Sequence, residues 1–409
     1  MTHFAILAPP LRGHYRPLSN LAAELIARGH RATFVHHRDA RALVEAEGAG
    51  FEAIGADLPP VASWTHPMAR IHGLFGLGRT LQGMVAYTDA FCREGPALLD
   101  RIGAEAIVAD QLEAAGGLLA EALGLPFASV ATTLPIDRDE SVPPPYVPWD
   151  YRPGESGRRR NRGGWAVADL LLAPIGRGIA RNCRRLSIPP RSRMEDCLSD
   201  RLQVAQIVRG FDFPRESLPE AFHYTGPFRR PAPRPFALPD PDGRPLVYCT
   251  LGTLQGSRIR LFRKVALACR DLGLRLLITR GGPAAPGRAW RLPGDPSIYD
   301  WVPQEAVVAA ADLTVSHAGM NAVLDPLAAG IPSVVMPLAF EQPAIAARLA
   351  RTGAGLVARP SGPVRTLRAK IALAREDGSC RARAKALAAE IAAAGGVARA
   401  ADLIEAAIP

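Results

Sequence analysis

Apolar and polar positions follow two alternating periods along the first part of the chain. Residues 4–8 form a short apolar run. A helical spacing of three and four residues then links Leu18, Leu21, Ala22, Leu25 and Ile26. Gly29 ends this pattern, and residues 32–35 are apolar again. Because the same strand–helix–strand rhythm returns at residues 106–131, the pattern predicts a parallel sheet with helices on both faces.

A second series of the same kind follows a Pro-rich stretch. Residues 229–245 hold many prolines and little periodicity, which predicts a semi-rigid linker. Strand and helix patterns alternate again from residue 246 onward, so we expect two doubly wound α/β domains. The first domain would cover 1–228, the second 246–392, and a helix at 393–409 would pack back toward the first domain. Ligands bind beyond the carboxyl ends of such strands, so the cleft between the domains is the expected site.

Two stretches, residues 60–103 and 134–193, fit this rhythm poorly. Both are rich in Pro, Gly and apolar residues, and we expect them to form a variable substrate pocket. Gly73, Gly76 and Gly78 lie in the first stretch. No strand pattern precedes these glycines and their spacing differs from a dinucleotide-binding fingerprint, so we assign them no such role.

The chain is basic, with a formal charge of +10 and a sequence pI near 9.8. No helix-turn-helix, zinc-finger or RNP-like pattern accompanies this charge, so nucleic acid is not an expected partner. The densest basic run, residues 158–162, stands in a Gly-rich context. We expect a solvated loop there, with attraction to an anionic membrane surface as the alternative.

The sequence also bears on the compartment and on cofactors. No stretch approaches the roughly 18 to 20 apolar residues that span a bilayer, and the N-terminus lacks the charged region of a signal peptide. The six cysteines form no CxxC pair, the His and Cys residues lack metal-ligand spacing, and no Walker A motif occurs. These features favour a cytoplasmic enzyme with reduced thiols, no metal and no bound cofactor. The inner face of the cytoplasmic membrane is a second location to consider.

His14 and Asp110 are the candidate catalytic residues. His14 follows the first strand in a loop that opens the first helix, where Pro17 suits a first-turn position. An imidazole there can take a proton from an acceptor hydroxyl at neutral pH. Asp110 ends the strand pattern at 106–109, so its carboxylate can fix the tautomer of the imidazole and stabilise the imidazolium. The alternatives are a structural histidine in a loop and an aspartate that caps the following helix.

A long segment of the second domain carries groups that suit a nucleotide sugar. Trp301 can stack on a base, and Gln304 can reach the base or the ribose edge. Asp325 lies in the helix that follows and could hold ribose hydroxyls. Glu341 and Gln342 come after the next strand pattern and can hydrogen-bond the hydroxyls of a sugar.

The same segment offers a place for a diphosphate. His317, Gly319 and Asn321 stand where a strand pattern turns into a helix. The free N–H groups and the dipole of a helix N-terminus favour an anion. Thr253 follows another strand end, and its hydroxyl could also meet a phosphate oxygen.

In this order, these residues resemble a known family. W-V-P-Q at 301–304, S-H-A-G-M-N at 316–321, an acidic residue at 325, G-I-P at 330–332 and F-E-Q at 340–342 are similar to the sugar-donor signature of the UDP-glycosyltransferases. Those are inverting, metal-independent enzymes of the GT-B architecture, which has two Rossmann-like domains. The likeness extends to V-A-D-Q at 108–111, F-D-F-P-R-E-S-L-P at 211–219 and L-G-T-L-Q-G at 251–256, which look like bacterial zeaxanthin glucosyltransferases.

The resemblance implies glucose transfer from UDP-glucose to the terminal ring hydroxyls of a carotenoid, giving a mono- and then a diglucoside. It makes His14 the base and Asp110 its partner. Carried over by residue, it places uracil on the Trp301 ring and the ribose on Asp325. The whole donor-binding set is Thr253, Trp301, Val302, Gln304, His317, Gly319, Asn321, Ala322, Asp325, Glu341 and Gln342. Because zeaxanthin is dissolved in membranes, we also expect peripheral membrane binding through the N-terminal domain.

Three positions depart from the commonest family pattern, and other functions stay open. Ala322 replaces a serine, Asp325 is one methylene shorter than the usual glutamate, and Glu341 replaces an aspartate that reads the sugar. The last change leaves the identity of the hexose open. The acceptor could be another apolar hydroxyl compound, such as a sterol, a macrolide or a phenolic. A nucleotide-sugar epimerase and a non-catalytic carotenoid or lipid binder are alternatives from other classes. The apolar stretches at 60–103 and 134–193, with His14 rather than a carboxylate at the cleft, argue against the epimerase, and the His14–Asp110 pair argues against the binder.

Overall fold

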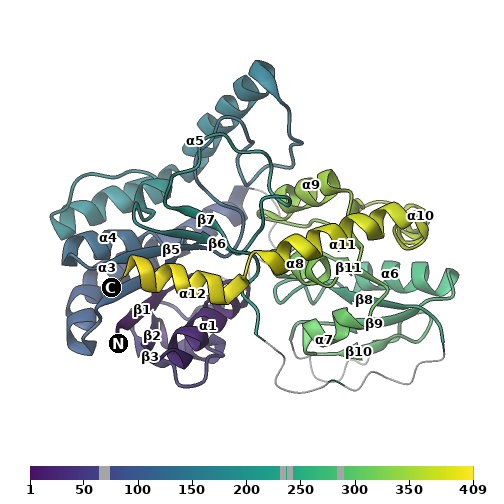
Figure 1. Ribbon diagram of the computed structural model, residues 1–409, viewed down its shortest axis with the longest axis horizontal. Helices are drawn as coiled ribbons and strands as arrows, with labels where there is room; N and C mark the ends of the chain where they lie inside the picture. The colour runs from purple at the N-terminus through teal and green to yellow at the C-terminus, as the bar shows by residue number, and fades with distance from the viewer. Residues whose placement is uncertain (64–73, 231–235, 237–242, 283–289, 409) are drawn as a thin grey trace.

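Two parallel β-sheets with helices packed on their faces make up the fold (Figure 1). The computed structural model describes residues 1–63, 74–230, 236, 243–282 and 290–408. The first sheet is built from the N-terminal part of the chain and the second from the C-terminal part, and the last helix returns to the first sheet (Figure 1). This arrangement confirms the prediction of two doubly wound α/β units.

The first sheet has the strand order β3-β2-β1-β4-β5-β6-β7. Its strands are β1 (His3–Leu7), β2 (Arg31–His36), β3 (Gly50–Ala53), β4 (Ala106–Asp110), β5 (Phe127–Ala131), β6 (Gln203–Ala205) and β7 (Phe222–Tyr224). The chain winds outward from β1 to one edge and then returns to pair β4 with the other side of β1. Such a reversal of strand order leaves a crevice beyond the carboxyl ends of the two central strands. His14 follows one of these strands and Asp110 ends the other.

The second sheet repeats this plan with the order β10-β9-β8-β11-β12-β13. Its strands are β8 (Leu246–Thr250), β9 (Arg275–Thr279), β10 (Ser297–Tyr299), β11 (Leu313–Ser316), β12 (Ser333–Val335) and β13 (Gly355–Val357). The order reverses between β8 and β11, which pair in parallel. Thr253 and His317 lie just beyond the ends of these two strands, so the second crevice carries part of the predicted donor site.

Helices follow the strands of both sheets. They are α1 (Arg12–Ala27), α3 (Leu74–Ile102), α4 (Ala115–Leu123) and α5 (Gly154–Leu186) in the first domain, and α6 (Ile259–Asp271), α7 (Gln304–Ala309), α8 (Met320–Ala328), α9 (Gln342–Thr352), α10 (Val364–Glu376) and α11 (Gly378–Ala393) in the second. The chain then breaks at Gly395, whose φ of 84° is left-handed. Beyond this break, α12 (Gly396–Ala407) packs against α1.

Alternate side chains of β1 enter two separate cores. Ala5 and Leu7 pack with apolar residues of α3, α4 and α5, while Phe4 and Ile6 pack with those of α1 and α12. All four side chains are buried. A strand that is covered on both faces reads as a continuous apolar run, which is why residues 4–8 were recognisable in the sequence.

Two long helices, α3 and α5, occupy much of the stretches that fit the sequence rhythm poorly. They pack against each other, and Phe91 and Ile179 enter the same core. The sequence concealed them because Pro96 and Pro174 stand inside these helices, and proline is rare in helix interiors. Residues 64–73, which include Gly73, lie outside the described residues. That these stretches form the acceptor pocket stays a prediction.

The expectation of a loop at residues 158–162 is wrong, because this basic run lies in the first turns of α5. Arg158 pairs with Glu216. Arg162 pairs with Glu140 at 2.8 Å. These carboxylates come from neighbouring loops and offset part of the charge of the run. Arginine also has a high helix propensity, so the glycines around the run were misleading.

Most of the predicted linker at 229–245 lies outside the described residues. The first sheet ends at Tyr224 and the second begins at Leu246. Within the ranges that the structure describes, no helix combines the length and the apolar character that crossing a bilayer requires.

Gly117 of α4 should tolerate no side chain. An added Cβ would overlap the carbonyl oxygen of Cys197. We expect Gly117→Ala to lower the free energy of unfolding by roughly 1–3 kcal/mol, the usual cost of overpacking. Urea denaturation followed by circular dichroism measures the change. Gly163→Ala is the control, because nothing lies within 4 Å of its added Cβ and alanine is the better helix former. Equal stability changes in the two variants would contradict the packing argument.

Candidate active site

A buried His–Asp pair borders the crevice of the first sheet. His14 lies in the first turn of α1 rather than in the loop before it, and its Nδ1 donates to Oδ2 of Asp110 at 2.8 Å. The backbone N–H of Leu112 donates to Oδ1 of Asp110 at 2.9 Å, and the Thr132 hydroxyl donates to Oδ2. Asp110 does not cap the following helix, whose N-cap is Ala114. Since a carboxylate only accepts, these contacts fix the proton on Nδ1 and leave Nε2 to act as a base.

The charges around His14 favour its protonated form. Burial alone would lower the pKa of the imidazole, but Asp110 outweighs burial and Glu341 adds to its effect, so the pKa of His14 is raised. Glu341 belongs to the second domain, and this influence on the base was not predicted from the sequence. Burial in turn raises the pKa of Glu341, and His14 opposes that change. Residues of both domains therefore set the proton affinity of His14.

One cavity of about 870 Å³ runs between the two domains. This volume is within the range of ligand-binding pockets. His14 lines it from the first domain. From the second domain it is lined by nearly the whole predicted donor set, namely Thr253, Trp301, Val302, Gln304, His317, Gly319, Asn321, Ala322, Glu341 and Gln342. The structure thus brings the predicted donor residues together beside the His–Asp pair, with the exception of Asp325.

Trp301 is partly exposed, and an arginine of the first domain covers one face of its ring. The guanidinium of Arg12 lies 4.5 Å from the ring centroid, and Arg12 also pairs with Glu45. Cation–π attraction of this kind favours an arginine over an indole. Sequence reasoning missed Arg12, although its position two residues before His14 placed it beside the cleft. Arg12 is therefore a further candidate for contact with the nucleotide.

His317 is enclosed by two glycines at the end of β11. An added Cβ at Gly252 would stand 2.7 Å from the His317 ring, and one at Gly319 would stand 2.5 Å from it. Burial lowers the pKa of His317 to about 4, while a hydrogen bond to the Thr250 carbonyl opposes the change. The ring is therefore neutral at pH 7 and carries a single N–H, which can be donated either to the Thr250 carbonyl or to a phosphate oxygen but not to both.

Asn321 bridges the domains at the N-terminus of α8. Its Nδ2 donates to the carbonyl of Gly13 at 3.0 Å, and its Oδ1 accepts from Gln206 at 3.3 Å. Gly319 is the N-cap of α8, and its neighbours Met320 and Asn321 line the cavity. The unpaired N–H groups of this first turn are suited to an anion. Because Gly13 directly precedes His14, the Asn321 contact also ties the predicted diphosphate end to the base.

Asp325 is buried behind Gln304 and does not line the cavity. Arg229 donates to its Oδ1 at 2.9 Å, and Gln304 donates to its Oδ2. Nη1 of Arg16 lies 3.9 Å from Oδ2 of Asp325. The carboxylate therefore orients the Gln304 amide, which does line the cavity. A direct contact of Asp325 with ribose hydroxyls stays a prediction and requires that one of these partners move.

Glu341 and Gln342 open α9 at another part of the cavity. Glu341 is the N-cap residue. The side-chain oxygen of Gln342 accepts from the backbone N–H groups of Leu338 and Ala339, each at 2.9 Å. Phe340, which lies between Ala339 and Glu341, has a φ of 56°, which is rare for a residue with a side chain. These contacts hold the tight turn that presents Glu341 to the cavity.

The cleft divides its chemistry between two sheets. One sheet supplies a histidine supported by a carboxylate, and the other supplies a helix N-terminus, a neutral histidine and an exposed indole. Among the residues that the structure describes, no group of three or more His, Cys, Asp or Glu side chains could hold a metal ion. Two Rossmann-like domains with this bipartite cleft define a glycosyltransferase of the GT-B architecture.

Comparisons with known proteins agree with this class. Residues 285–406 match the family described as erythromycin biosynthesis protein CIII-like, C-terminal domain. The chain is 38% identical to the zeaxanthin glucosyltransferase of Pseudescherichia vulneris, over 100% of this chain and 98% of the relative. It is 34% identical to the zeaxanthin glucosyltransferase of Pantoea ananas, over 87% of this chain and 84% of the relative. The chain therefore belongs to the glycosyltransferase family that includes these enzymes, as the resemblance implied.

A solved structure shares the whole fold. The glycosyltransferase of kitacinnamycin superposes with a TM-score of 0.79 and covers 100% of this chain and 99% of its own. Its identity to this chain is 23%, so the likeness supports the architecture alone. It confirms the predicted GT-B arrangement of the two domains.

Replacing Asp110 by Asn should shift the acidic limb of the pH–rate profile. Asp110 raises the pKa of His14, and the base works only when neutral, so the wild-type rate falls as the pH drops through that raised pKa. In Asp110→Asn the pKa of His14 falls and the limb moves to lower pH. The plateau rate should drop on the order of 100-fold or more, because the imidazolium loses its counter-charge. The measurement is kcat/KM for sugar transfer across the neutral range. An unmoved limb would contradict the assignment of His14 as the base.

Proposed function

We propose that the protein transfers glucose from UDP-glucose to the terminal ring hydroxyls of zeaxanthin or a related carotenoid, with inversion at the anomeric carbon. The observation that carries the proposal is the 38% identity to a zeaxanthin glucosyltransferase over 100% of the chain. The supported base His14 in the cleft is consistent with activation of a hydroxyl. A carotenoid with a hydroxyl on each terminal ring would give a monoglucoside and, after release and re-entry, a diglucoside.

In the proposed reaction, Nε2 of His14 takes the proton of the acceptor hydroxyl while its oxygen attacks C1 of glucose. The bond between C1 and the β-phosphate oxygen breaks, and its electron pair leaves with UDP. Because the new bond forms opposite the breaking one, the configuration at C1 inverts. Asp110 stabilises the imidazolium that results. Both substrates must be held in line, so positioning supplies much of the acceleration.

The donor would lie along the second sheet. In this proposal the ring of Trp301 stacks on uracil and Gln304 reaches the ribose, with Asp325 behind it. His317, Asn321 and Thr253 meet the diphosphate, and the N-terminus of α8 offsets its developing charge without a metal ion. Glu341 and Gln342 hold the sugar hydroxyls. The choice of glucose as the transferred sugar is based on the names of the relatives. Because Glu341 stands where the family usually has an aspartate, the identity of the hexose is the part of the proposal that the site residues support least.

Replacing His14 by Ala should abolish transfer and leave UDP-glucose binding nearly intact, because the base acts on the acceptor rather than on the donor. UDP release with and without zeaxanthin, together with chromatography of the glucosides, measures transfer, and calorimetry measures donor binding. His223→Ala is the matched control, since His223 lies on β7 and does not line the cavity. Addition of EDTA should leave the wild-type rate unchanged.

Different results would redirect the proposal. Full turnover by His14→Ala would remove the base assignment. UDP release with a sterol, a macrolide or a phenolic, and none with a carotenoid, would change the acceptor class. Interconversion of UDP-sugars without transfer would indicate an epimerase. Carotenoid binding with no use of UDP-glucose would indicate a binding protein.

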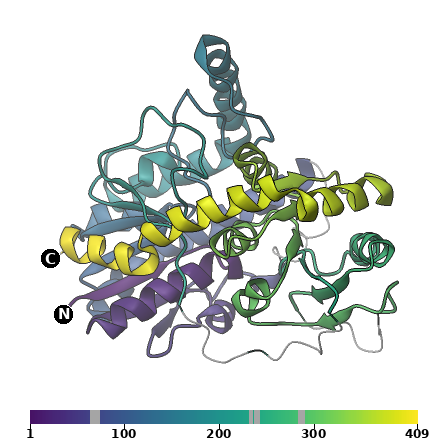
Figure 2. The ribbon, with the colours of Figure 1, turned by 45° about the vertical axis from the view of Figure 1, so that its right-hand side comes forward.

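We also propose that the protein works in the cytoplasm at the inner face of the membrane, where a carotenoid acceptor is dissolved. One end of α5 projects beyond both sheets (Figures 1 and 2). Val167, Leu170 and Leu171 are exposed on this helix by 57%, 76% and 41%, and their spacing places them on one side. Arg159 and Arg177 are exposed on the same helix. Apolar side chains that enter lipid beside arginines at the headgroups are typical of a peripheral membrane contact.

A double variant with Val167→Asp and Leu170→Asp should lose vesicle binding. Burying a Val or Leu side chain contributes about 1.5–3 kcal/mol, so the partition coefficient should fall at least about tenfold. Co-sedimentation with anionic lipid vesicles measures it, at low and at physiological salt. Leu373→Asp is the control, because Leu373 is 53% exposed on α10 of the other domain. The proposal would be removed if the wild-type protein failed to co-sediment both at low and at physiological salt.

A further inference from the structure

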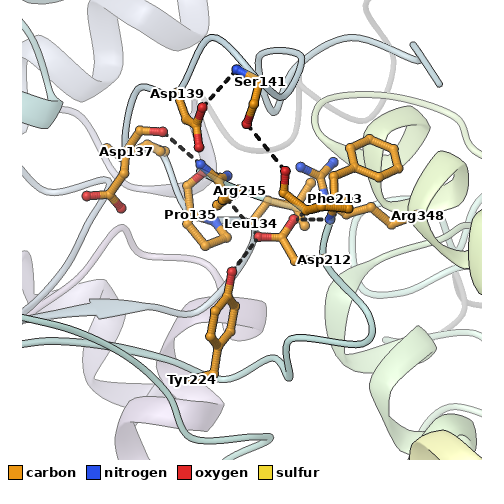
Figure 3. A network of polar contacts seen from close by, with 12 residues as sticks. Leu134, Pro135, Asp137, Asp139, Ser141, Asp212, Phe213, Arg215, Tyr224 and Arg348 are labelled. Carbon is orange, nitrogen blue, oxygen red and sulfur yellow. Dashed lines mark hydrogen bonds and ion pairs between the residues drawn. The ribbon is translucent and has the colours of Figure 1, made fainter. Parts of the chain in front are cut away.

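The F-D-F-P-R motif at 211–215 forms a buried ion pair between the domains (Figure 3). Asp212 accepts a hydrogen bond from Nε of Arg215, in the same segment, at 2.8 Å, and one from Nε of Arg348, on α9, at 2.7 Å. The side chains of Asp212 and Arg348 are fully buried. Burial alone would raise the pKa of Asp212, but the two guanidinium groups hold it well below its usual range. The motif therefore supplies an ionised carboxylate to an arginine of the other domain.

Further contacts fix this carboxylate in one orientation. The Tyr224 hydroxyl donates to Oδ2 of Asp212 at 3.1 Å, and the backbone N–H of Phe213 donates to Oδ1 at 2.8 Å. The guanidinium of Arg348 lies 4.3 Å from the centroid of the Phe213 ring (Figure 3). A buried ion pair with several further hydrogen bonds has little freedom to slide, unlike an exposed one.

On the first domain, the pair is attached to the loop that supports the catalytic dyad. Arg215 donates to the carbonyl of Asp137 at 2.9 Å and to that of Pro135 at 3.0 Å (Figure 3). These carbonyls belong to the loop that leaves β5. The same loop begins with Thr132, whose hydroxyl donates to Asp110. A displacement of Arg215 would therefore reach the support of the base within a few residues.

On the second domain, the pair is attached to the helix that opens at the sugar end of the cavity. Arg348 lies on α9, and Glu341 and Gln342 stand at the start of that helix and line the cavity. Nη1 of Arg348 also donates to the carbonyl of Ala344, one turn earlier on the same helix, at 3.3 Å. Because a helix is stiff over two turns, fixing Arg348 fixes the position of its N-terminus.

We propose that Asp212 and Arg348 are positioning residues for sugar transfer. Their buried pair holds α9, and with it Glu341 and Gln342, at a set distance from the base on the first sheet. This inference rests on the proposed function, in which the sugar lies at the start of α9. The nucleotide groups lie on α8 and in the loop of Trp301, so loss of the pair should misplace the sugar and leave the nucleotide bound.

The test compares sugar selectivity with nucleotide binding in Arg348→Met, Asp212→Asn and Arg348→Lys. Per folded molecule, kcat with UDP-glucose should fall between about 10- and 100-fold in the first two variants, because small misplacements of reacting groups cost this much. The preference for UDP-glucose over UDP-galactose should shrink, and the affinity for UDP should stay within about twofold. Arg348→Lys keeps the charge but loses the planar group, so it should fall between these variants and the wild type.

Arg351→Met is the matched control on the same helix, because Arg351 is exposed and its guanidinium lies 5.5 Å from the centroid of the Tyr151 ring rather than in the buried pair. Its selectivity and kcat should equal those of the wild type. The selectivity ratio is independent of the folded fraction, so a merely structural role would leave it unchanged. An unchanged ratio and an unchanged kcat per folded molecule in Asp212→Asn and Arg348→Lys would overturn the proposal, even if Arg348→Met fails to fold. If the wild-type protein uses neither donor, the proposed function fails separately, and the same ratio is measured with the nucleotide sugar it does use and its C4 epimer.

Discussion

The position of one sheet against the other is the constraint on which the rest of the structure depends. Parallel strands collect reactive side chains at their carboxyl ends, but His14 and Glu341 belong to different sheets. The contacts that hold the sheets in place include the hydrogen bond from Asn321 of α8 to Gly13, the packing of α12 on α1, and the buried pair of Asp212 and Arg348. The ion pair tolerates change least, since removing one partner of a buried pair costs about 3–5 kcal/mol. The ion pair and the packing of α12 thus lie outside the cleft that they maintain.

Much of this arrangement could be predicted from local sequence pattern. Central strands that are buried on both faces read as apolar runs, and the polar residue that follows each run must lie at the edge of the sheet. This logic located His14 and Asp110, which the structure joins at 2.8 Å. It also located His317 and Asn321 beyond β11, because a strand that turns directly into a helix leaves its N–H groups free. The position of these groups after strand patterns therefore predicted residues that line the cavity from both domains.

Contacts between distant segments were beyond the reach of pattern. Asp212 and Arg348 are 136 residues apart, and no spacing rule connects them. Asp325 shares a helix with Asn321, which suggested a place at the cavity, but Arg229 holds its carboxylate behind Gln304. The long helices α3 and α5 were missed for a different reason, because glycines and internal prolines weaken a helical pattern that tertiary packing then restores. The direction of a side chain and the packing that stabilises a weak helix both arise only in the folded chain.

Glu341 shows how such contacts change the meaning of a residue. In the sequence it raises a question about the hexose, because it replaces an aspartate. In the structure its charge adds to the effect of Asp110, which raises the pKa of His14 against the effect of burial, while His14 favours the ionised form of Glu341. Hydrogen bonds from sugar hydroxyls to the Glu341 carboxylate would favour its ionised form and, with it, the protonated form of His14. In the proposed function the same side chain contacts the sugar and acts on His14, so it would join recognition of the donor to activation of the acceptor.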